Sequence, residues 1–123
     1  MKLAKKFKQS RADLEHALTF VEKIKEDAFY YSGIVKSFEV CFEYAWKYLK
    51  EIIFNKGLEA FSPRDIIKVA GQANVIDNVE KWLQFLEDRN LSVHDYLGIS
   101  EEDYLKTISE FSNEAKKLSE RKF

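Results

Sequence analysis

The feature that most constrains the fold is a long apolar pattern between residues 29 and 55. Alternating steps of four and three residues connect one stripe, made of Ile34, Phe38, Cys41, Ala45, Tyr48 and Ile52. A second stripe runs beside it, made of Val35, Phe42, Trp46, Leu49 and Ile53. A helix that is apolar over so much of its circumference needs two neighbouring helices, or a second subunit, to cover it. The pattern therefore predicts a central helix from Phe29 to Asn55.

The rest of the chain also favours long helices, because residues that end them are rare. Only four glycines and one proline occur among 123 residues, and no segment alternates as a strand does. Apolar spacing and capping residues predict four further helices, over residues 3–25, from Ser62 to about Asn74, from Asp77 to about residue 96, and onward from Ser100. We predict an all-α single domain over residues 1–123. Its architecture would be an antiparallel up-and-down four-helix bundle with the short Ser62 helix in a crossover.

Composition argues against several classes of protein. Lys and Arg total 20 and Asp and Glu total 21, so the net charge of −1 does not suit a general nucleic-acid clamp. One cysteine and two histidines make a metal site improbable, and no cofactor-binding motif is present. We expect Cys41 to be a small buried hydrophobe. No segment approaches about 18 apolar residues and no secretory signal is evident, which favours a cytoplasmic protein without a membrane span.

Positive charge gathers near both ends of the chain. Basic residues precede the first acidic one at Lys2, Lys5, Lys6, Lys8 and Arg11, and others follow at Lys116, Lys117, Arg121 and Lys122. If the two ends lie side by side, they form one basic patch that could attract phosphate. A solvated helix surface is the simpler interpretation, and we prefer it.

The densest cluster of chemically capable side chains lies at the end of the predicted fourth helix. Trp82, Leu83 and Leu86 form an apolar stripe, but its continuation reaches Asn90 and His94. A core stripe that becomes polar is a local inconsistency of the kind that functional sites produce. The structural alternative is that these polar groups cap the helix end or face solvent.

Helix geometry restricts how this cluster could work. Asn90 and His94 are four residues apart and share a helix face, whereas Arg89 and His94 lie about 140° apart around an unbroken helix. For Arg89 and His94 to act on one phosphate, the helix must loosen near Leu91 and Ser92, or a second chain must supply one of them.

Three charged residues of the central helix are weaker candidates for substrate binding. Glu39, Glu43 and Lys47 are spaced so that they can form ion pairs on the helix surface. Such pairing is the simpler interpretation, and an acidic role beside a site is the alternative. The other histidine, His16, is expected at the surface.

The segment Arg89-Asn90-Leu-Ser-Val-His94-Asp-Tyr96 resembles the signature of the HEPN superfamily: an Arg, a polar residue, a spacer and a His, with an added Tyr. Other segments resemble one branch of it, the nucleotidyltransferase substrate-binding protein family. These are Phe38-Glu39, Phe42-Glu43 and Trp46-Lys47 in the central helix, then Ser62-Pro63-Arg64, Trp82 and residues 86–90. The similarity spans about Phe38 to Tyr96.

The resemblance implies a helical bundle that forms a homodimer and places two copies of the motif near each other. It also implies a partner, a separately encoded minimal nucleotidyltransferase that carries the metal-binding carboxylates. This chain would then bind the nucleotide or substrate. In related toxin–antitoxin pairs, the helical protein is instead a metal-independent ribonuclease, and its nucleotidyltransferase silences it by adding AMP to the motif Tyr.

The residue types suit this chemistry. His94 would act as general base or acid on RNA, and Arg89 would clamp the phosphate. Asn90 would orient His94 or the phosphate, and Tyr96 would be the modification acceptor, because AMP there places a negative phosphate beside Arg89. The sequence leaves open whether the chain binds a nucleotide or cleaves RNA.

Overall fold

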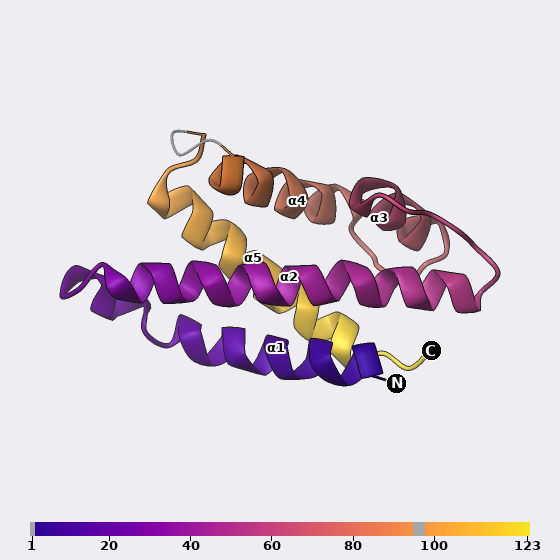
Figure 1. Cartoon of the computed structure of the whole chain (residues 1–123), viewed down its shortest axis with the longest axis horizontal. Helices are drawn as coiled ribbons and strands as arrows, with labels where there is room; N and C mark the ends of the chain where they lie inside the picture. The colour runs from indigo at the N-terminus through magenta and orange to yellow at the C-terminus, as the bar shows by residue number, and fades with distance from the viewer. Residues whose placement is uncertain (1, 95–97) are drawn as a thin grey trace.

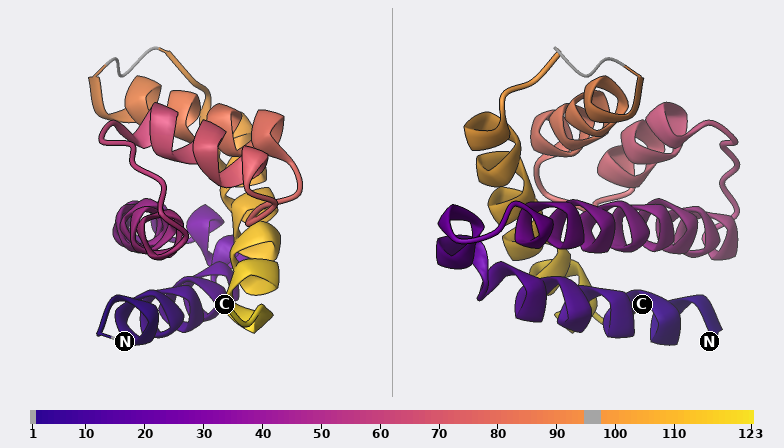
Figure 2. Two further views of the ribbon diagram at one scale, coloured as in Figure 1. Left: turned by 90° about the vertical axis from the view of Figure 1, so that its right-hand side faces the viewer. Right: turned by 60° about the vertical axis from the view of Figure 1, so that its left-hand side comes forward.

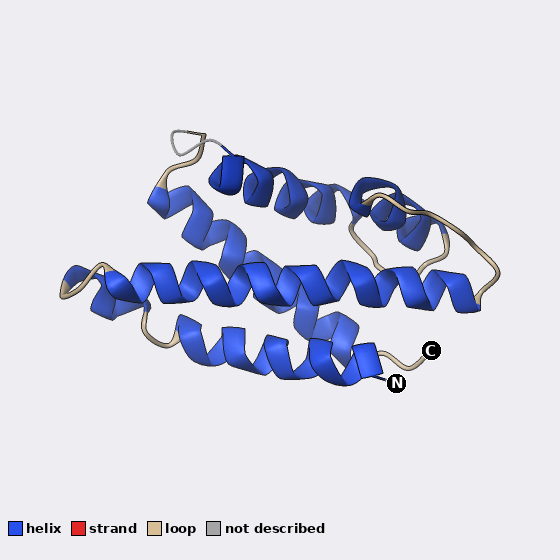
Figure 3. Cartoon of the chain, viewed as in Figure 1, coloured by secondary structure: helices blue, strands red, loops and turns tan. Residues whose placement is uncertain are grey.

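The computed structural model describes residues 2–94 and 98–123, except for the side chains of Val93 and His94. Within these residues the chain contains five α helices, one 3-10 helix and no strand (Figure 3). The helices are α1 (Lys2–Leu18), η1 (Val21–Lys25), α2 (Phe29–Asn55), α3 (Pro63–Gln72), α4 (Val79–His94) and α5 (Glu101–Glu120). The all-helical prediction is confirmed. None of the described helices is long and apolar enough to cross a membrane.

Helix α2 lies at the centre of the molecule, as its two apolar stripes predict (Figure 1). Helix α1 packs along α2, while α3 also contacts α2 and then packs against α4. Helix α5 contacts α1, α2 and α4, and it crosses α2 obliquely (Figures 1 and 2). The short α3 connects α2 to α4, where the sequence predicts a crossover helix. A regular up-and-down bundle of four antiparallel helices stays a prediction.

The core is rich in aromatic rings and is centred on Phe111 of α5. The Phe111 ring packs edge to face against Phe38 and Phe42 of α2 and against Trp82 and Phe85 of α4, with centroids 5.2–5.7 Å apart. All five side chains are at most 1% exposed. Such ring pairs contribute about 0.5–1.5 kcal/mol each beyond the burial of their area. The cluster therefore holds α4 against α2 and α5.

Local hydrogen bonds set most helix ends as the sequence predicts. Ser62 and Ser100 cap α3 and α5, each accepting a hydrogen bond of 3.1 Å from the backbone N–H three residues later. Gly57 follows α2 with φ of +83°, a left-handed conformation that favours glycine. Helix α4 starts slightly later than predicted, because the Asn78 side chain accepts a hydrogen bond from the Lys81 N–H at 3.1 Å.

The predicted first helix is interrupted. Helix α1 ends at Leu18 and η1 follows, so the prediction of one helix over residues 3–25 was wrong. The Thr19 hydroxyl donates to the His16 carbonyl at 2.6 Å, and Phe20 stacks on Tyr30 of α2 at 5.6 Å. A side chain that bonds to the backbone competes with the helical ladder. The spacing of apolar residues does not reveal such local contacts, so it did not predict the interruption.

The single cysteine is buried, as predicted. Cys41 is 0% exposed within the core. Burial raises the pKa of its thiol to about 12, so the thiol is protonated near neutral pH. Cys41 therefore packs as a small apolar side chain.

The two ends of the chain lie at the same side of the molecule (Figures 1 and 2). Part of their positive charge is engaged locally. Arg11 pairs with Glu15 at 2.7 Å, Lys117 pairs with Glu114 at 3.1 Å, and Arg121 donates to a backbone carbonyl. Phosphate binding at this surface stays a prediction.

Two glycines allow the packing of α3 against α4 to be tested. A Cβ added at Gly71 would lie 1.9 Å from Cγ2 of Val79, a stiff, half-buried side chain at the start of α4. We expect Gly71→Ala to lower the free energy of unfolding by about 1–3 kcal/mol in urea denaturation. Gly33 in α2 meets no atom within 4 Å, so Gly33→Ala should raise stability by about 0.5–1 kcal/mol. Equal effects of the two substitutions would contradict this packing.

Candidate functional site

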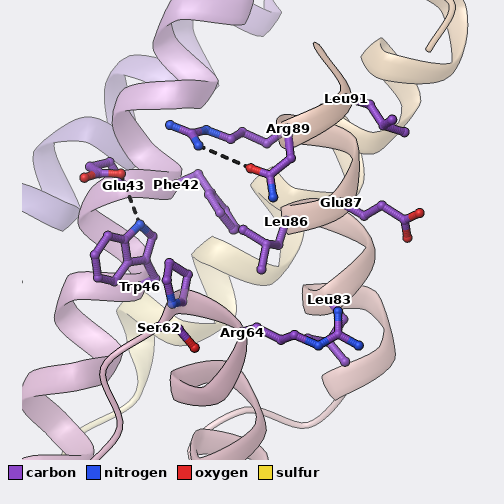
Figure 4. Close-up of a pocket in the computed structure, with 12 residues that line it drawn as sticks. Phe42, Glu43, Trp46, Ser62, Arg64, Leu83, Leu86, Glu87, Arg89 and Leu91 are labelled. Atoms are coloured by element: carbon purple, nitrogen blue, oxygen red, sulfur yellow. Dashed lines mark hydrogen bonds between the residues drawn. The ribbon is translucent and has the colours of Figure 1, made fainter. Parts of the chain in front are cut away.

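A cavity of about 890 Å³ lies between α2, the start of α3 and α4 (Figure 4). Three segments form its wall: Phe42, Glu43 and Trp46 from α2, Ser62, Pro63 and Arg64 from the start of α3, and Leu83, Leu86, Glu87, Arg89, Asn90 and Leu91 from α4. Its size and its mixture of apolar and polar side chains are typical of small-molecule sites. Arg89 and Asn90, singled out by the sequence, both line it.

Helix α4 divides its side chains between the core and this cavity. Trp82 and Phe85 are each 1% exposed and face the core, whereas Leu83 and Leu86 are half-buried and line the cavity. The predicted stripe of Trp82, Leu83 and Leu86 does pack against the core, but the prediction left out the buried Phe85. A helix with apolar residues on two faces does not indicate which face meets the core.

Asp88 is a buried polar residue that the sequence analysis did not single out. Its Oδ2 accepts a hydrogen bond from the Thr107 hydroxyl of α5 at 2.6 Å, and its Oδ1 accepts one from Gln84 at 2.8 Å. Asp88 is 7% exposed and Thr107 9%. Because hydrogen bonds are directional, this contact fixes the rotation of α4 immediately before Arg89 and Asn90. The position of Asp88, three residues after Phe85 on the core face, was the available signal.

Arg89 extends from α4 toward α2 across one side of the cavity (Figure 4). Its Nη1 donates to Asn90 Oδ1 at 3.3 Å. Its Nε is buried and has no hydrogen-bond partner within the described part of the chain. Leaving a buried donor unsatisfied costs about 1–3 kcal/mol. An anion in the cavity would supply the acceptor, and a guanidinium binds carboxylate or phosphate in a bidentate manner.

Glu43 orients an aromatic side chain at the same cavity. It accepts a hydrogen bond from the Trp46 indole N–H at 3.1 Å and pairs with Lys47 at 3.3 Å. The predicted surface pair therefore forms between Glu43 and Lys47. Lys47 and Glu39 are not among the described residues that line the cavity. Substrate binding by these three residues stays a prediction.

Tyr104 of α5 is a buried phenol whose ionisation responds to Glu39 and Arg89. Burial raises the pKa of Tyr104 to about 12, the Glu39 carboxylate acts in the same direction, and the Arg89 guanidinium opposes it. Both charges are therefore close enough to the buried phenol of Tyr104 to affect its ionisation.

The remaining site residues lie beyond what the structure describes. Helix α4 is continuous through Leu91 and Ser92 to His94, so the alternative in which the helix loosens there does not hold. A contribution from a second chain stays a prediction. The side chain of His94 and all of Tyr96 are outside the described residues. Among the side chains that are described, no group of three or more His, Cys, Asp or Glu could hold a metal ion.

Comparison with known proteins provides a family and a related fold. Residues 3–122 match the family described as nucleotidyltransferase substrate binding protein like. A similar solved structure is the rebuilt and re-refined tri-AMPylated HEPN toxin of Shewanella oneidensis in complex with MNT antitoxin. The TM-score is 0.79 over 96% of this chain and 91% of that chain, at 15% identity, which shows the fold alone. No curated protein sequence matches the chain.

The contact between Asp88 and Thr107 gives a prediction for stability. Thr107→Val keeps the side-chain shape but removes the donor, so a buried carboxylate oxygen loses a partner. We expect the free energy of unfolding to fall by about 1–3 kcal/mol. Thr107→Ser keeps the hydroxyl and should cost clearly less. Urea denaturation of both variants measures this, and equal losses would indicate that only the methyl group matters.

Proposed function

Because the chain belongs to the nucleotidyltransferase substrate-binding protein-like family, we propose that it binds the substrate or nucleotide for a separately encoded minimal nucleotidyltransferase. The observation that carries the proposal is the buried, unpartnered Nε of Arg89 in the wall of a cavity. The partner is supported by the similar HEPN toxin, whose structure is a complex with an MNT antitoxin.

In this two-component system, the nucleotidyltransferase supplies the metal-binding carboxylates and performs the transfer. The helical chain holds the ligand in its cavity. Arg89 binds the phosphate, and Asn90 restrains the guanidinium through their 3.3 Å hydrogen bond. Asp88 keeps this part of α4 in place through its bond to Thr107. Folding already orders these side chains, so ligand binding does not have to supply the free energy of ordering them.

We further propose that the protein acts in the cytoplasm as a homodimer of single-domain bundles, in which α1, α2, α4 and α5 run up and down. The reason for proposing a homodimer is that α4 is unbroken up to His94. In an unbroken α helix, positions 89 and 94 are about 140° apart around the axis. Two copies that face each other could bring Arg89 of one chain and His94 of the other to one phosphate.

Complex formation tests the proposed partnership. The purified chain is mixed with a candidate minimal nucleotidyltransferase from the same genome and analysed by size exclusion with light scattering. We expect a complex that contains two copies of the helical chain, because the dimer is the proposed functional unit. Arg89→Ala should leave this complex intact, since Arg89 faces the cavity. Separate elution of the two proteins at micromolar concentration would contradict the proposal.

A second candidate function is that of a metal-independent ribonuclease toxin, silenced by AMP addition to Tyr96. Its support is that the similar HEPN toxin is tri-AMPylated. In this scheme, His94 accepts the proton of the RNA 2′-hydroxyl, and Arg89 stabilises the negative charge that develops on the phosphorane. AMP on Tyr96 would add a competing phosphate beside Arg89.

An RNA cleavage assay in EDTA separates the two candidates. A substrate-binding subunit should leave RNA intact. A ribonuclease should cleave it, and His94→Ala should slow cleavage by about 100-fold or more, because general acid–base catalysis contributes that much. Circular dichroism of His94→Ala controls for folding. A mass increase equal to AMP after incubation with the nucleotidyltransferase and ATP, absent in Tyr96→Phe, would identify Tyr96 as the acceptor.

A further inference from the structure

The cavity wall contains more apolar surface than a phosphate group alone can cover. The wall also includes Phe42, Trp46 and Leu86, which lie below Arg89 in the view of Figure 4. Phe42 is fully buried, whereas Trp46 and Leu86 are only half-buried. A small inorganic anion would leave Trp46 and Leu86 in contact with water. A ligand that also carries a flat apolar group would cover them.

The Trp46 ring is held in a fixed orientation. Its indole N–H donates to Glu43, and the Lys47 ammonium, paired with Glu43, lies 5.8 Å from the ring centroid. The polar edge of the ring is therefore satisfied by α2 itself. An aromatic side chain that is already ordered loses little conformational entropy when a second ring packs against it.

The two arginines of the cavity wall lie at different sides. Figure 4 shows Arg89 extending from α4 toward α2 above Phe42, and Arg64 extending from the start of α3 toward Leu83. The Nε of Arg89 is buried and unpartnered within the described chain, whereas Arg64 is exposed. Arg89 is thus the cation that gains most from an anionic ligand.

We propose that the cavity binds one free nucleotide, with its base packed against Trp46 and its phosphate on Arg89. This inference rests on the proposed function and specifies the ligand class of the same site. Glu43 and Glu87 in the wall, together with a net charge of −1, disfavour a long polyanion such as an RNA strand. Base stacking is tolerant of sequence, so either a purine or a pyrimidine satisfies the geometry.

A series of four ligands tests the two halves of this site. AMP carries base and phosphate, ribose 5-phosphate lacks the base, adenosine lacks the phosphate, and inorganic phosphate lacks both the base and the ribose. Isothermal titration calorimetry should give the highest affinity for AMP. Tryptophan fluorescence provides a second readout, because the protein has two tryptophans and Trp82 is 1% exposed, so a ligand-dependent change reports on Trp46.

Three variants assign the roles. Trp46→Leu should weaken AMP binding by about tenfold or more and leave ribose 5-phosphate binding unchanged, which also shows that the variant is folded. Arg89→Ala should weaken binding of AMP and of ribose 5-phosphate by about tenfold or more and binding of adenosine little. Arg64→Ala is the matched control, because it removes one positive charge from the same wall. It should weaken AMP binding clearly less than Arg89→Ala does.

Several outcomes would overturn the proposal. Equal affinities of AMP and ribose 5-phosphate would exclude a base site. Equal losses of AMP affinity in the two arginine variants would show that the cavity attracts anions in general and that Arg89 has no specific role. Tighter binding of a short oligoadenylate than of AMP would indicate that the cavity binds a nucleic-acid strand and not a free nucleotide. If AMP does not bind at millimolar concentration while the nucleotidyltransferase complex forms, this inference alone fails. AMP binding without any such complex would instead refute the proposed partnership.

Discussion

The packing of Phe111 against four other rings is the interaction on which the rest of the structure depends. It joins Phe38 and Phe42 of α2 to Trp82 and Phe85 of α4. Phe42 has a second role, because it also lines the cavity. The core and the candidate site therefore share a side chain. Any loss of the ring cluster would allow α4 to move from α2, and the cavity between them would lose its shape.

Apolar packing alone would not fix the orientation of α4, since it is non-directional. The hydrogen bond from Thr107 to Asp88 supplies the direction, because it allows only a narrow range of rotations of α4 relative to α5. Arg89 and Asn90 follow in the same turn, so their side chains are directed into the cavity. A buried polar pair next to an aromatic cluster is thus the means by which the fold positions its candidate binding groups.

The cavity combines groups that a purely structural helix junction does not require. Arg89 has a buried donor without a partner in the described chain, while Glu43 uses its carboxylate to orient the Trp46 indole. A cation with an open donor and a fixed aromatic ring suit a ligand that is anionic at one end and aromatic at the other. The unbroken end of α4 adds a separate constraint, since one chain alone separates Arg89 from His94 around the helix.

The sequence by itself determined the all-helical class, the central α2 and the caps at Ser62 and Ser100, and it singled out Arg89 and Asn90 as candidates, both of which line the cavity. These follow from periodicity and from contacts within a few residues, which a linear pattern records. Only the tertiary structure decided that Phe85 and Asp88 face the core, that Glu43 holds Trp46, and that Arg64 reaches the same cavity as Arg89. Periodicity defines the faces of a helix, but the neighbour that covers each face depends on how distant helices pack.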